Sequence, residues 1–445
     1  MLDGDVVVPG SGRYAGARQL WDTRFDVLKP RAIAYCANVA DVERVVRWSR
    51  STGIHVVPRS GGHSYGGYSS GNGVVVADVS RLSGVAVSGT RATVGAGAKL
   101  IGVYAALAQH GLTIPAGSCP TVGVAGLALG GGVGYASRRF GTTADNLRQL
   151  RIVTADGELL TCDASHHPDL FWAGRGGGGG NFGIATSFTF ATHPVSTVST
   201  YSIEWPWAQA AQAVAAWQAF APHAPDALFS VIDLIATDPS VANARAHVVS
   251  AGQYFGPESD LASLLQPLTS TGTPIRVTTS TLSYLDAVLH WAGCRDAASC
   301  TEPRSAFTAK SDYVNQPLSS AAIATLVNGV AARQGQGRGA LYLDAHGGAI
   351  NRVPKAATAF VHRDALFSIQ YTSQGSGSAW LQALYAQMRP HVSGFAYQNY
   401  IDPKLATWAH AYYGGNLPRL RAVKRKFDPH GLFRFAQGIR PQGHS

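Results

Sequence analysis

A histidine and a cysteine lie inside two glycine-rich segments of the 445-residue chain, and both side chains can form covalent bonds. His63 lies in the run Pro58-Arg-Ser-Gly-Gly-His-Ser-Tyr, after the apolar stretch 54–57. A strand that feeds adjacent glycines leaves backbone N–H groups free to point at one anion, and glycine lets the main chain approach a phosphate closely. The spacing fits neither a Rossmann fingerprint nor a P-loop. The run predicts a pyrophosphate site; the alternative, a tight surface loop, leaves the histidine unexplained.

Cys119 lies in the second segment, which begins Gly117-Ser-Cys-Pro-Thr-Val-Gly. Small residues at positions 123, 126, 130 and 134 recur about once per helical turn, which predicts a face against which another backbone or a flat ligand packs. Taken alone, a cysteine before a proline is more often a buried structural thiol than a reactive one. A third cluster of glycines occupies 174–183. The clusters therefore predict folded backbone brought close to a ligand.

The elements that must position these segments indicate a mixed α/β or α+β first domain. Helices are predicted at 38–52, capped by Asn38, and at 99–110, strands at 54–58, 74–78 and 182–190, and a hairpin turn at Asp156-Gly157. After residue 194 the glycine clusters end. Helix-like segments at 208–221, 319–332 and 378–389 then alternate with β-rich runs at 246–254, 275–281, 340–346 and 366–373. This alternation predicts a second domain, an antiparallel sheet backed by helices. One long helix is expected from Asp402 to Phe427.

Composition excludes several classes of protein. Hydrophobic residues make up 46% of the chain, which excludes a disordered protein, and the length predicts two or three domain-sized units. The net charge is +10, but the basic residues are scattered except for one group near residue 420. That group is predicted to be the solvated face of a helix rather than a nucleic-acid patch. Its members are Arg419, Arg421, Lys424, Arg425 and Lys426.

Neither a membrane span nor a metal site is expected. No apolar stretch approaches the roughly 18 residues that a bilayer requires. The histidines show no ligand spacing for zinc, and the five cysteines are too irregular for a disulfide framework. The sequence leaves open whether Cys294 and Cys300 form a disulfide, and a disulfide would favour export. Because the N-terminus shows no signal peptide, the chain is expected in the cytosol or, slightly favoured, outside the cell after removal of a signal.

A set of ordered motifs resembles the berberine-bridge-enzyme-like flavoprotein oxidases of the vanillyl-alcohol-oxidase/p-cresol-methylhydroxylase superfamily over nearly the whole chain. The motifs are Arg59-Ser-Gly-Gly-His-Ser-Tyr, Gly117-Ser-Cys-Pro-Thr-Val-Gly, Gly141-Thr-Thr-Ala-Asp-Asn-Leu, the run from Asp169 to Gly183, Tyr397-Gln-Asn-Tyr and Lys426-Phe-Asp-Pro-His-Gly-Leu-Phe. The resemblance implies an α+β fold with a two-subdomain, PCMH-type FAD-binding domain and an inserted antiparallel-sheet substrate domain backed by helices. The expected boundaries are 1–196 for the FAD domain, 197–399 for the substrate domain and 400–445 for a C-terminal segment that returns to the FAD domain.

The resemblance implies an FAD that is attached twice, because His63 matches the residue bonded to the 8α-methyl and Cys119 the residue bonded to C6. The first loop would hold the pyrophosphate through N–H groups of residues 60–64. The other residues expected to hold FAD are Arg59, Ser60, Gly61, Gly62, Ser64, Gly67, Gly117, Ser118, Val122, Gly123, Gly126, Gly130, Gly131, Gly134, Asn181, Gly183, Ile184 and Asn399. Val122 matches the position that governs access of oxygen, and a small residue there is typical of oxidases; simple packing is the alternative.

Tyr397 matches a catalytic tyrosine of carbohydrate-oxidising relatives, and Asp344 a carboxylate that partners it. Oxidising an alcohol requires a hydride acceptor and a base for the hydroxyl proton. Tyr397 would be that base, and the alternative is an aromatic ring that packs on the flavin. Asp344 would be a relay or an orienting acceptor, and the alternative is an ordinary acid at the end of a strand. Tyr65 and Tyr342 are the expected substrate contacts. An aromatic residue at 342 makes the pocket less polar than a pure sugar site.

The sequence thus predicts an FAD-dependent oxidase that converts a hydroxyl-bearing carbon, for instance an anomeric carbon going to a lactone, and reduces O2 to H2O2. Alternatives are oxidation of a small aromatic or natural-product alcohol or amine, a dehydrogenase with another electron acceptor, and a flavin-loaded binding protein without turnover. The expected partners are the small-molecule substrate and O2, with no nucleic acid, no membrane, and a monomer or weak dimer.

Overall fold

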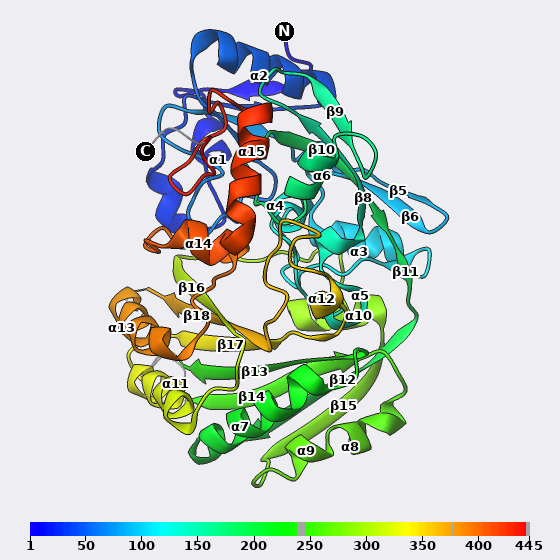
Figure 1. Ribbon diagram of the computed structural model, residues 1–445, viewed down its shortest axis with the longest axis vertical. Coiled ribbons are helices and arrows are strands. Elements are labelled where there is room, and N and C mark those ends of the chain that lie inside the picture. The colour runs from blue at the N-terminus through cyan, green and yellow to red at the C-terminus, as the bar shows by residue number, and fades with distance from the viewer. Residues whose placement is uncertain (238–244, 376, 442–445) are drawn as a thin grey trace.

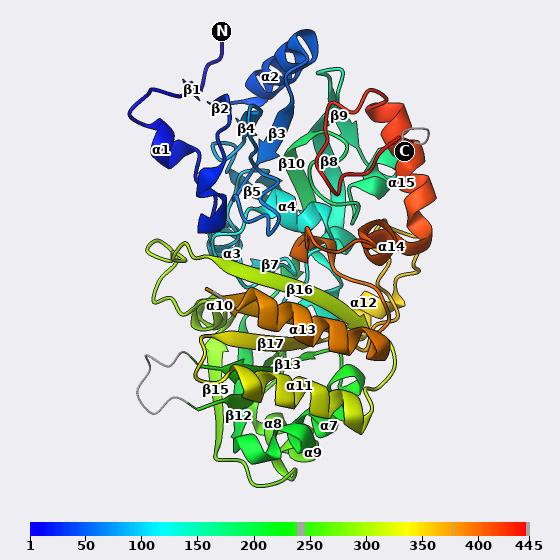
Figure 2. The ribbon, with the colours of Figure 1, turned by 90° about the vertical axis from the view of Figure 1, so that its left-hand side faces the viewer.

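The computed structural model describes residues 1–237, 245–375 and 377–441. Two small sheets form one end of the elongated molecule and a large sheet forms the other (Figure 1). Figure 2 shows that the C-terminal helices lie beside the small sheets, although the large sheet separates them from those sheets in sequence. This arrangement is the predicted α+β fold, with the C-terminal segment returning to the first part of the chain.

The first small sheet is mixed and has the order β1-β2-β4-β3. Its strands are β1 Asp5–Val7, β2 Ala32–Tyr35, β3 Val56–Arg59 and β4 Val75–Asp78. Helix α2, Val39–Thr52, connects β2 to β3; the side chain of Asn38 accepts a hydrogen bond from the N–H of Asp41, and Gly53 ends the helix at φ +70°. Both β2 and β3 run parallel to β4. The loop that carries His63 therefore starts where a buried parallel strand ends.

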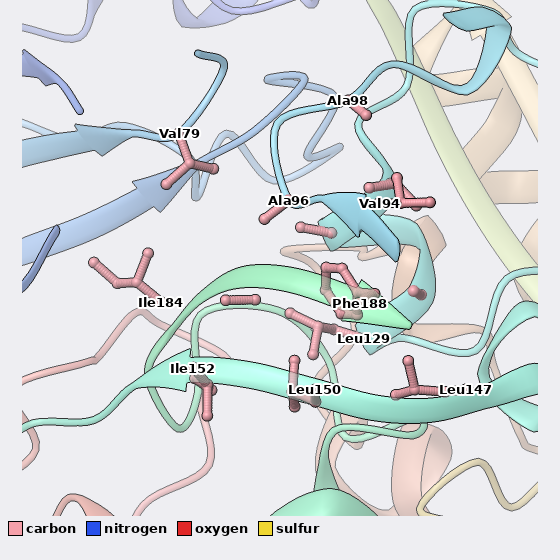
Figure 3. Packing of buried hydrophobic residues seen from close by; sticks show 14 of the residues in the cluster. Val79, Val94, Ala96, Ala98, Leu129, Leu147, Leu150, Ile152, Ile184 and Phe188 are labelled. Carbon is pink, nitrogen blue, oxygen red and sulfur yellow. The ribbon is translucent and has the colours of Figure 1, made fainter. Parts of the chain in front are cut away.

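The second sheet is antiparallel, in the order β5-β6-β10-β8-β9. Its strands are β5 Val85–Ser88, β6 Arg91–Gly95, β10 Ile184–Ala191, β8 Leu147–Val153 and β9 Leu159–Cys162. The predicted hairpin turn between β8 and β9 is confirmed, with Gly157 at φ +77°. Val94, Leu150 and Phe188 are fully buried on this sheet (Figure 3). Each such side chain contributes about 1.5–3 kcal/mol by leaving water.

The large sheet has seven antiparallel strands, in the order β15-β12-β14-β13-β17-β18-β16. They are β12 Thr197–Trp205, β13 Leu228–Ala236, β14 His247–Tyr254, β15 Arg276–Ser283, β16 Phe307–Val314, β17 Gly339–Ala345 and β18 Phe367–Gln374. Helices α7 Ala210–Phe220, α11 Ser320–Arg333 and α13 Ser378–Met388 pack together over one face. Along β13, Ile232 and Leu234 are fully buried on that face, whereas the alternate residues Val231 and Asp233 are only partly buried. The second face therefore borders more open space.

The remaining elements connect these sheets. The short helices and strands are α1 Tyr14–Ala17, α3 Leu100–Ala108, β7 Leu112–Thr113, α5 Ser137–Phe140, α6 Pro168–Ala173, β11 His193–Pro194, α8 Leu261–Leu264, α9 Gln266–Thr269, α10 Tyr284–Ala292 and α12 Gly348–Arg352. The 3-10 turns are η1 Thr23–Val27, η2 Thr143–Asn146, η3 Trp207–Gln209, η4 Ala221–His223, η5 Glu258–Asp260, η6 Arg389–His391, η7 Gln398–Tyr400 and η8 Gly414–Asn416. The large sheet lies wholly within 197–374, and the domain limits at 196 and 399 stay a prediction.

The prediction of one long C-terminal helix is wrong. The structure has two helices, α14 Trp408–Tyr413 and α15 Leu417–Phe427, separated by a 3-10 turn. Gly414 adopts φ +47°, and Pro418 lies in the first turn of α15. A left-handed glycine ends a helix, and proline cannot continue one from the preceding turn.

The basic group on α15 is solvated as predicted at Arg419, Arg425 and Lys426, but Lys424 is an exception. Lys424 is buried and donates to the carboxylate of Asp428 at 2.6 Å and to the carbonyl oxygens of Asn181 and Phe433. Arg419 lies over the ring of Trp172 at 4.0 Å. The side of α15 that carries Lys424 therefore packs against the loop at Asn181, and Arg419 covers Trp172 of α6 from the outside.

The glycine-rich stripe at 123–134 is likewise only partly helical. Helix α4 spans Val124–Leu129, and Gly131 and Gly132 adopt positive φ, so residues 130 and 134 lie beyond the helix. The cysteine pair left open by the sequence is a disulfide between Cys294 and Cys300. Among the described residues, no helix is both long and apolar enough to cross a membrane.

Candidate active site

A deep cavity lies where the glycine-rich loops meet. It contains about 1690 Å³ of space outside the protein atoms, including its open mouth. Most of its wall comes from residues 56–65, from residues within 117–129 and 178–185, and from 397–401 and 434–435, together with Gln370 of β18. Segments from both ends of the chain and one strand of the large sheet therefore share one space.

The loop after β3 presents unpaired hydrogen-bond donors to this cavity. Among the described residues, none accepts a hydrogen bond from the backbone N–H groups of residues 60–64. Arg59 is buried, pairs through Nε with Asp78, and keeps Nη1 without a partner. A Cβ on Gly61 would lie 2.3 Å from the nitrogen of Gly123, so only glycine allows the first two loops to touch. Free N–H groups and a guanidinium nitrogen without a partner in one wall suit a diphosphate.

His63 lies at the inner end of the same loop. Its Nε2 is 2.9 Å from the hydroxyl of Thr121, and its ring stacks on Trp21 with centroids 5.2 Å apart. Burial lowers the pKa of His63 to about 4, and the charge of Lys99 acts in the same direction. The imidazole is therefore neutral at neutral pH and carries a lone pair on one nitrogen.

Cys119 is the exposed member of the three free cysteines, because it borders the cavity, while Cys36 and Cys162 are buried. Protein surrounds the thiol on its other sides. That enclosure raises the pKa of Cys119 to about 12, and the charge of Glu302 adds to the effect. The structure thus brings His63 and Cys119, which are 56 positions apart, to one cavity.

Tyr397 borders the cavity with its hydroxyl held by two donors. The N–H of Gly132 and the amide of Asn399 each donate to the phenolic oxygen at 2.8 Å. Burial raises the pKa of Tyr397 above its usual value, whereas both donors lower it because they stabilise the phenolate. The backbone N–H of Tyr397 donates to the hydroxyl of Ser311 on β16 at 2.9 Å. The ring is thereby fixed between the glycine-rich segment and the large sheet.

Polar side chains cover the open face of the large sheet. On β17, Tyr342 and Asp344 point to this face, and Asp233 of β13 lies opposite Tyr342. Burial raises the pKa of Asp344 to about 6. The pKa of Asp233 lies well above its usual value because of burial and, second, the charge of Asp344. The two acids therefore influence each other's ionisation.

Tyr65 joins this face to the cavity. Its hydroxyl accepts a hydrogen bond from Gln370 at 2.9 Å, and its ring stacks on Tyr400 with centroids 5.4 Å apart. Gln370 lies opposite Tyr342 across β17 and β18. An aromatic pair at the mouth suits a ring-shaped ligand, since ring faces pack well against flat apolar surfaces.

Comparisons with known proteins agree with this geometry. A family model described as FAD binding domain matches residues 30–163, and one described as berberine and berberine like matches 396–440. The FAD-linked oxidoreductase YgaK of Bacillus subtilis is 36% identical over 93% of this chain and 91% of its own. Berberine bridge enzyme-like D-1 of Nicotiana tabacum is 32% identical over 93% of this chain and 83% of its own. The chain belongs to the berberine-bridge-enzyme-like FAD-linked oxidoreductases.

Solved structures of this family align over the whole flavoprotein. BBE-like 1 of Physcomitrella patens superposes with a TM-score of 0.92 and 32% identity, covering 99% of this chain and 98% of its own. A chitooligosaccharide oxidase does so with a TM-score of 0.87 and 26% identity, over 99% and 97%. Phl p 4, a grass pollen allergen with glucose dehydrogenase activity, has a TM-score of 0.87 and 29% identity, over 98% and 96%.

The residues of the cavity fit FAD. The free N–H groups of the first loop and Arg59 offer donors to a diphosphate, and the apolar residues Val122, Leu129 and Ile184 offer walls to a flat ring system. Asn181 lies behind the third glycine cluster, where its side-chain oxygen accepts from the N–H of Ile439 at 2.8 Å. The C-terminal segment thus supports the wall of the FAD site.

Most residues predicted from the sequence border this cavity. They are Arg59, Ser60, Gly61, Gly62, His63, Ser64, Tyr65, Gly117, Ser118, Cys119, Val122, Gly123, Gly126, Asn181, Gly183, Ile184, Tyr397 and Asn399.

Six predicted residues lie outside the lining: Gly67, Gly130, Gly131, Gly134, Tyr342 and Asp344. The glycines at 67 and 131 have positive φ and press against Phe25 and Phe360, and a Cβ at 130 would overlap Asn399. These glycines therefore serve packing between protein segments. Tyr342 and Asp344 face the open side of the large sheet instead.

Sequence reasoning missed several residues around the site. Glu302 accepts a hydrogen bond from Thr121, Gln370 holds Tyr65, and Asp233 lies beside Asp344. Gln398 donates to the carbonyl oxygens of Gly130 and Gly176 and so ties two glycine clusters together. Glu302 and Asp233 stand in no motif, and no signal in the sequence points to them. Gln398 lies within the motif Tyr397-Gln-Asn-Tyr, but the motif alone does not indicate that its side chain joins two glycine clusters.

Proposed function

We propose that this flavoprotein is an oxidase that removes a hydride from a hydroxyl-bearing carbon of a carbohydrate, converting an anomeric carbon to a lactone and O2 to H2O2. The observation that carries the proposal is the paired hydrogen bonding of the Tyr397 hydroxyl at the edge of the FAD cavity. The similarity to a chitooligosaccharide oxidase and to a xylooligosaccharide oxidase supports a sugar substrate. The aromatic pair Tyr65 and Tyr400 offers a stacking surface for a sugar ring.

Tyr397 acts as the base for the substrate hydroxyl. The Gly132 N–H and the Asn399 amide hold the phenolic oxygen and stabilise its negative charge, so the oxygen can take the hydroxyl proton while the carbon loses its hydride. FAD, when bound, supplies the hydride acceptor. Asp344, with its pKa raised to about 6, lies on the adjacent sheet face and accepts or releases protons near neutral pH. Asp344 is thus suited to orient a sugar hydroxyl.

Both proposed attachment points border the same cavity. Contact between Gly61 and Gly123 holds the His63 loop and the Cys119 segment together, so one ring system can bond to both side chains. Double attachment would hold the ring in place without loss of the cofactor. We extend the proposal to a bicovalent FAD for this reason.

A dehydrogenase is the second candidate, favoured by one comparison. Phl p 4 is described with glucose dehydrogenase activity, whereas a variant of it is described as a glucose oxidase. The electron acceptor therefore changes within one closely similar scaffold. Val122 borders the cavity, where its small side chain leaves room for O2. Replacing Val122 by isoleucine tests this: slower reoxidation of reduced enzyme by O2, with unchanged reduction by substrate, supports the oxidase.

Anaerobic bleaching of the bound flavin tests the substrate class. The purified protein is mixed without oxygen with a panel of mono- and oligosaccharides and of aromatic alcohols and amines, and the flavin absorbance is followed. We expect bleaching by a reducing sugar, and stoichiometric H2O2 when air is admitted. Bleaching by aromatic donors alone would overturn the carbohydrate assignment. Rapid bleaching without oxygen uptake would identify a dehydrogenase, and no bleaching by any donor a binding protein.

A further inference from the structure

A hydrogen-bonded chain leads from His63 to a carboxylate that no motif contains. The Nε2 of His63 is 2.9 Å from the Thr121 hydroxyl, which donates to Oε2 of Glu302 at 3.2 Å. We propose that Glu302, acting through Thr121, takes up the proton that His63 loses when FAD is attached to it. This inference rests on the proposed attachment at His63 and goes beyond it, because it assigns the residue that drives the attachment.

The direction of these hydrogen bonds determines which ring nitrogen of His63 carries the proton. An ionised carboxylate only accepts hydrogen bonds, so the single hydroxyl proton of Thr121 must point to Glu302. The Thr121 oxygen is then left to accept, and it accepts from Nε2–H of His63. The other ring nitrogen of His63 carries the lone pair and is free to attack a carbon. The arrangement resembles the way a carboxylate orients a catalytic histidine, with a hydroxyl inserted between the two groups.

Glu302 is held in place on both sides. The disulfide between Cys294 and Cys300 closes the chain two residues before it. On the other side, Arg304 donates to the carbonyl oxygen of Leu20 at 2.7 Å and pairs with Asp26, and the carbonyl of Ser305 accepts from Thr23. The segment that carries Glu302 therefore belongs to the large-sheet part of the sequence but is fastened to the N-terminal part beside Trp21.

The electrostatics around the chain suit proton transfer. Burial raises the pKa of the Glu302 carboxyl above its usual value, and the Thr121 hydrogen bond opposes this only in part. Burial and Lys99 keep the pKa of His63 near 4, so the ring is an uncharged nucleophile. The other titratable groups that sense Glu302 are Cys119 and Tyr65, and both are neutral at neutral pH. The Glu302 carboxylate, whose basicity is raised, can therefore accept the Nε2 proton of His63 through the Thr121 hydroxyl.

The attachment balances as an oxidation by O2. A bond forms between the free nitrogen of His63 and the 8α carbon, one methyl C–H bond breaks, and the N–H of His63 is lost. The electron pair of the broken C–H bond would reduce O2, and the two hydrogens released would complete H2O2. Glu302 holds the Nε2 proton during bond formation and then gives it up to solvent. The bond to Cys119 also requires loss of its S–H proton, but no hydrogen bond among the described residues joins this thiol to Thr121, so that proton leaves by a path other than the Thr121–Glu302 chain.

The test measures covalent flavin rather than turnover. Full-length Glu302→Gln and Thr121→Val proteins are purified and digested, and peptide masses give the flavin-linked fraction at His63 and at Cys119 separately. We expect the His63-linked fraction to fall at least tenfold in both variants while the Cys119-linked fraction is kept. Glu302→Asp and Thr121→Ser, which keep the carboxylate and the hydroxyl, should recover attachment in part. Glu258→Gln is the matched control, because Glu258 also accepts from threonine hydroxyls but lies by β15.

A pH series separates proton uptake from a structural role. Isolated Glu302→Gln protein is incubated in air with excess FAD from pH 6 to 9, and we expect its His63 link to form faster as the pH rises, since hydroxide replaces the missing acceptor. Wild-type attachment at both variants would overturn the relay while leaving the attachment itself standing. Equal loss at His63 and Cys119 would also overturn it, because that indicates weaker FAD binding. Wild-type protein without a His63 link would overturn both proposals.

Discussion

The hydroxyl of Tyr397 shows how two fixed hydrogen-bond donors oppose the effect of burial on the pKa of a phenol. Its oxygen receives hydrogen bonds from the backbone of Gly132 and from Asn399, two residues along the chain. Gly132 adopts φ +82°, which turns its N–H toward the ring, and a side chain there would clash with Thr143. A glycine thus contributes to the proposed chemistry through its backbone alone.

Replacing Tyr397 by phenylalanine removes the proposed base and keeps the ring. We expect kcat to fall about 10²–10⁴-fold, the usual contribution of a general base, with the flavin content unchanged. Because burial raises the pKa of Tyr397 and the phenolate is the active form, wild-type kcat should rise with pH and fall as the pH drops. The variant should lose this slope. Tyr412→Phe, which removes a buried hydroxyl bonded to the Asp402 N–H, is the control. Near-normal turnover of Tyr397→Phe removes Tyr397 from the mechanism.

His63 and Cys119 give a second prediction at this scale. Acid precipitation of the wild-type protein should leave the pellet yellow, because covalent bonds survive unfolding. Each single alanine variant should still retain flavin through its remaining bond, and the double variant His63→Ala, Cys119→Ala should release all of it to the supernatant. Absorbance of the two fractions measures the outcome. Release from the wild type contradicts attachment at either residue.

At the scale of elements, helix α15 ties the C-terminus to the cavity wall. Lys424 is buried between Asp428 and the carbonyl oxygens of Asn181 and Phe433, and Asn181 borders the cavity. The helix therefore holds the third glycine cluster through one ammonium group. Breaking a buried ion pair from one side is costly, because the other charge stays without a partner.

Lys424→Met should destabilise the protein by about 3–5 kcal/mol, since the carboxylate of Asp428 stays buried. Denaturant unfolding of the holoprotein measures this, and the exposed Lys404→Met is the control. We also expect noncovalent flavin in the His63→Ala, Cys119→Ala background to bind more weakly, because the Asn181 loop loses its anchor. A loss below 1 kcal/mol would contradict this anchoring role of Lys424.

How far the sequence could predict these elements depends on the range of the interactions. The helix at 38–52 and the strands beside His63 follow from local caps and apolar runs, and they are confirmed. The break between α14 and α15 also depends on local residues, Gly414 and Pro418, and could have been predicted from the sequence. The burial of Lys424 and the contact between Glu302 and Thr121 could not, since their partners lie 243 and 181 positions away. Only folding brings such residues together.

At the scale of the whole molecule, Arg138 fastens the two ends together. It is buried at the end of the second glycine-rich segment and donates to the carbonyl oxygens of Pro222, Ala224, Leu228 and His346, all in the large-sheet part. One guanidinium therefore makes four of the hydrogen bonds that hold the large sheet against the glycine-rich segment. Arg139, its neighbour, is exposed and donates only to Phe255.

Arg138→Met should cost about 3 kcal/mol or more, because several buried carbonyl groups lose a charged donor. We expect KM for the sugar to rise, since Asp344 and Tyr342 shift relative to the flavin, while covalent flavin stays unchanged. Arg139→Met should leave both quantities near wild type. Thermal unfolding and steady-state kinetics on the two variants give the comparison. Equal effects at 138 and 139 would argue against this role of Arg138.

The cavity wall also sets the order of events during synthesis. Arg59 and the loop after it leave the ribosome early, but Arg434 and Phe435 complete the same wall some 375 positions later in translation. Until residue 435 has emerged, the nascent chain offers FAD a cavity whose wall is incomplete. We therefore expect FAD capture to follow synthesis, since a ribosome that stalls within the last helices yields a chain with both proposed attachment residues but an incomplete cavity wall.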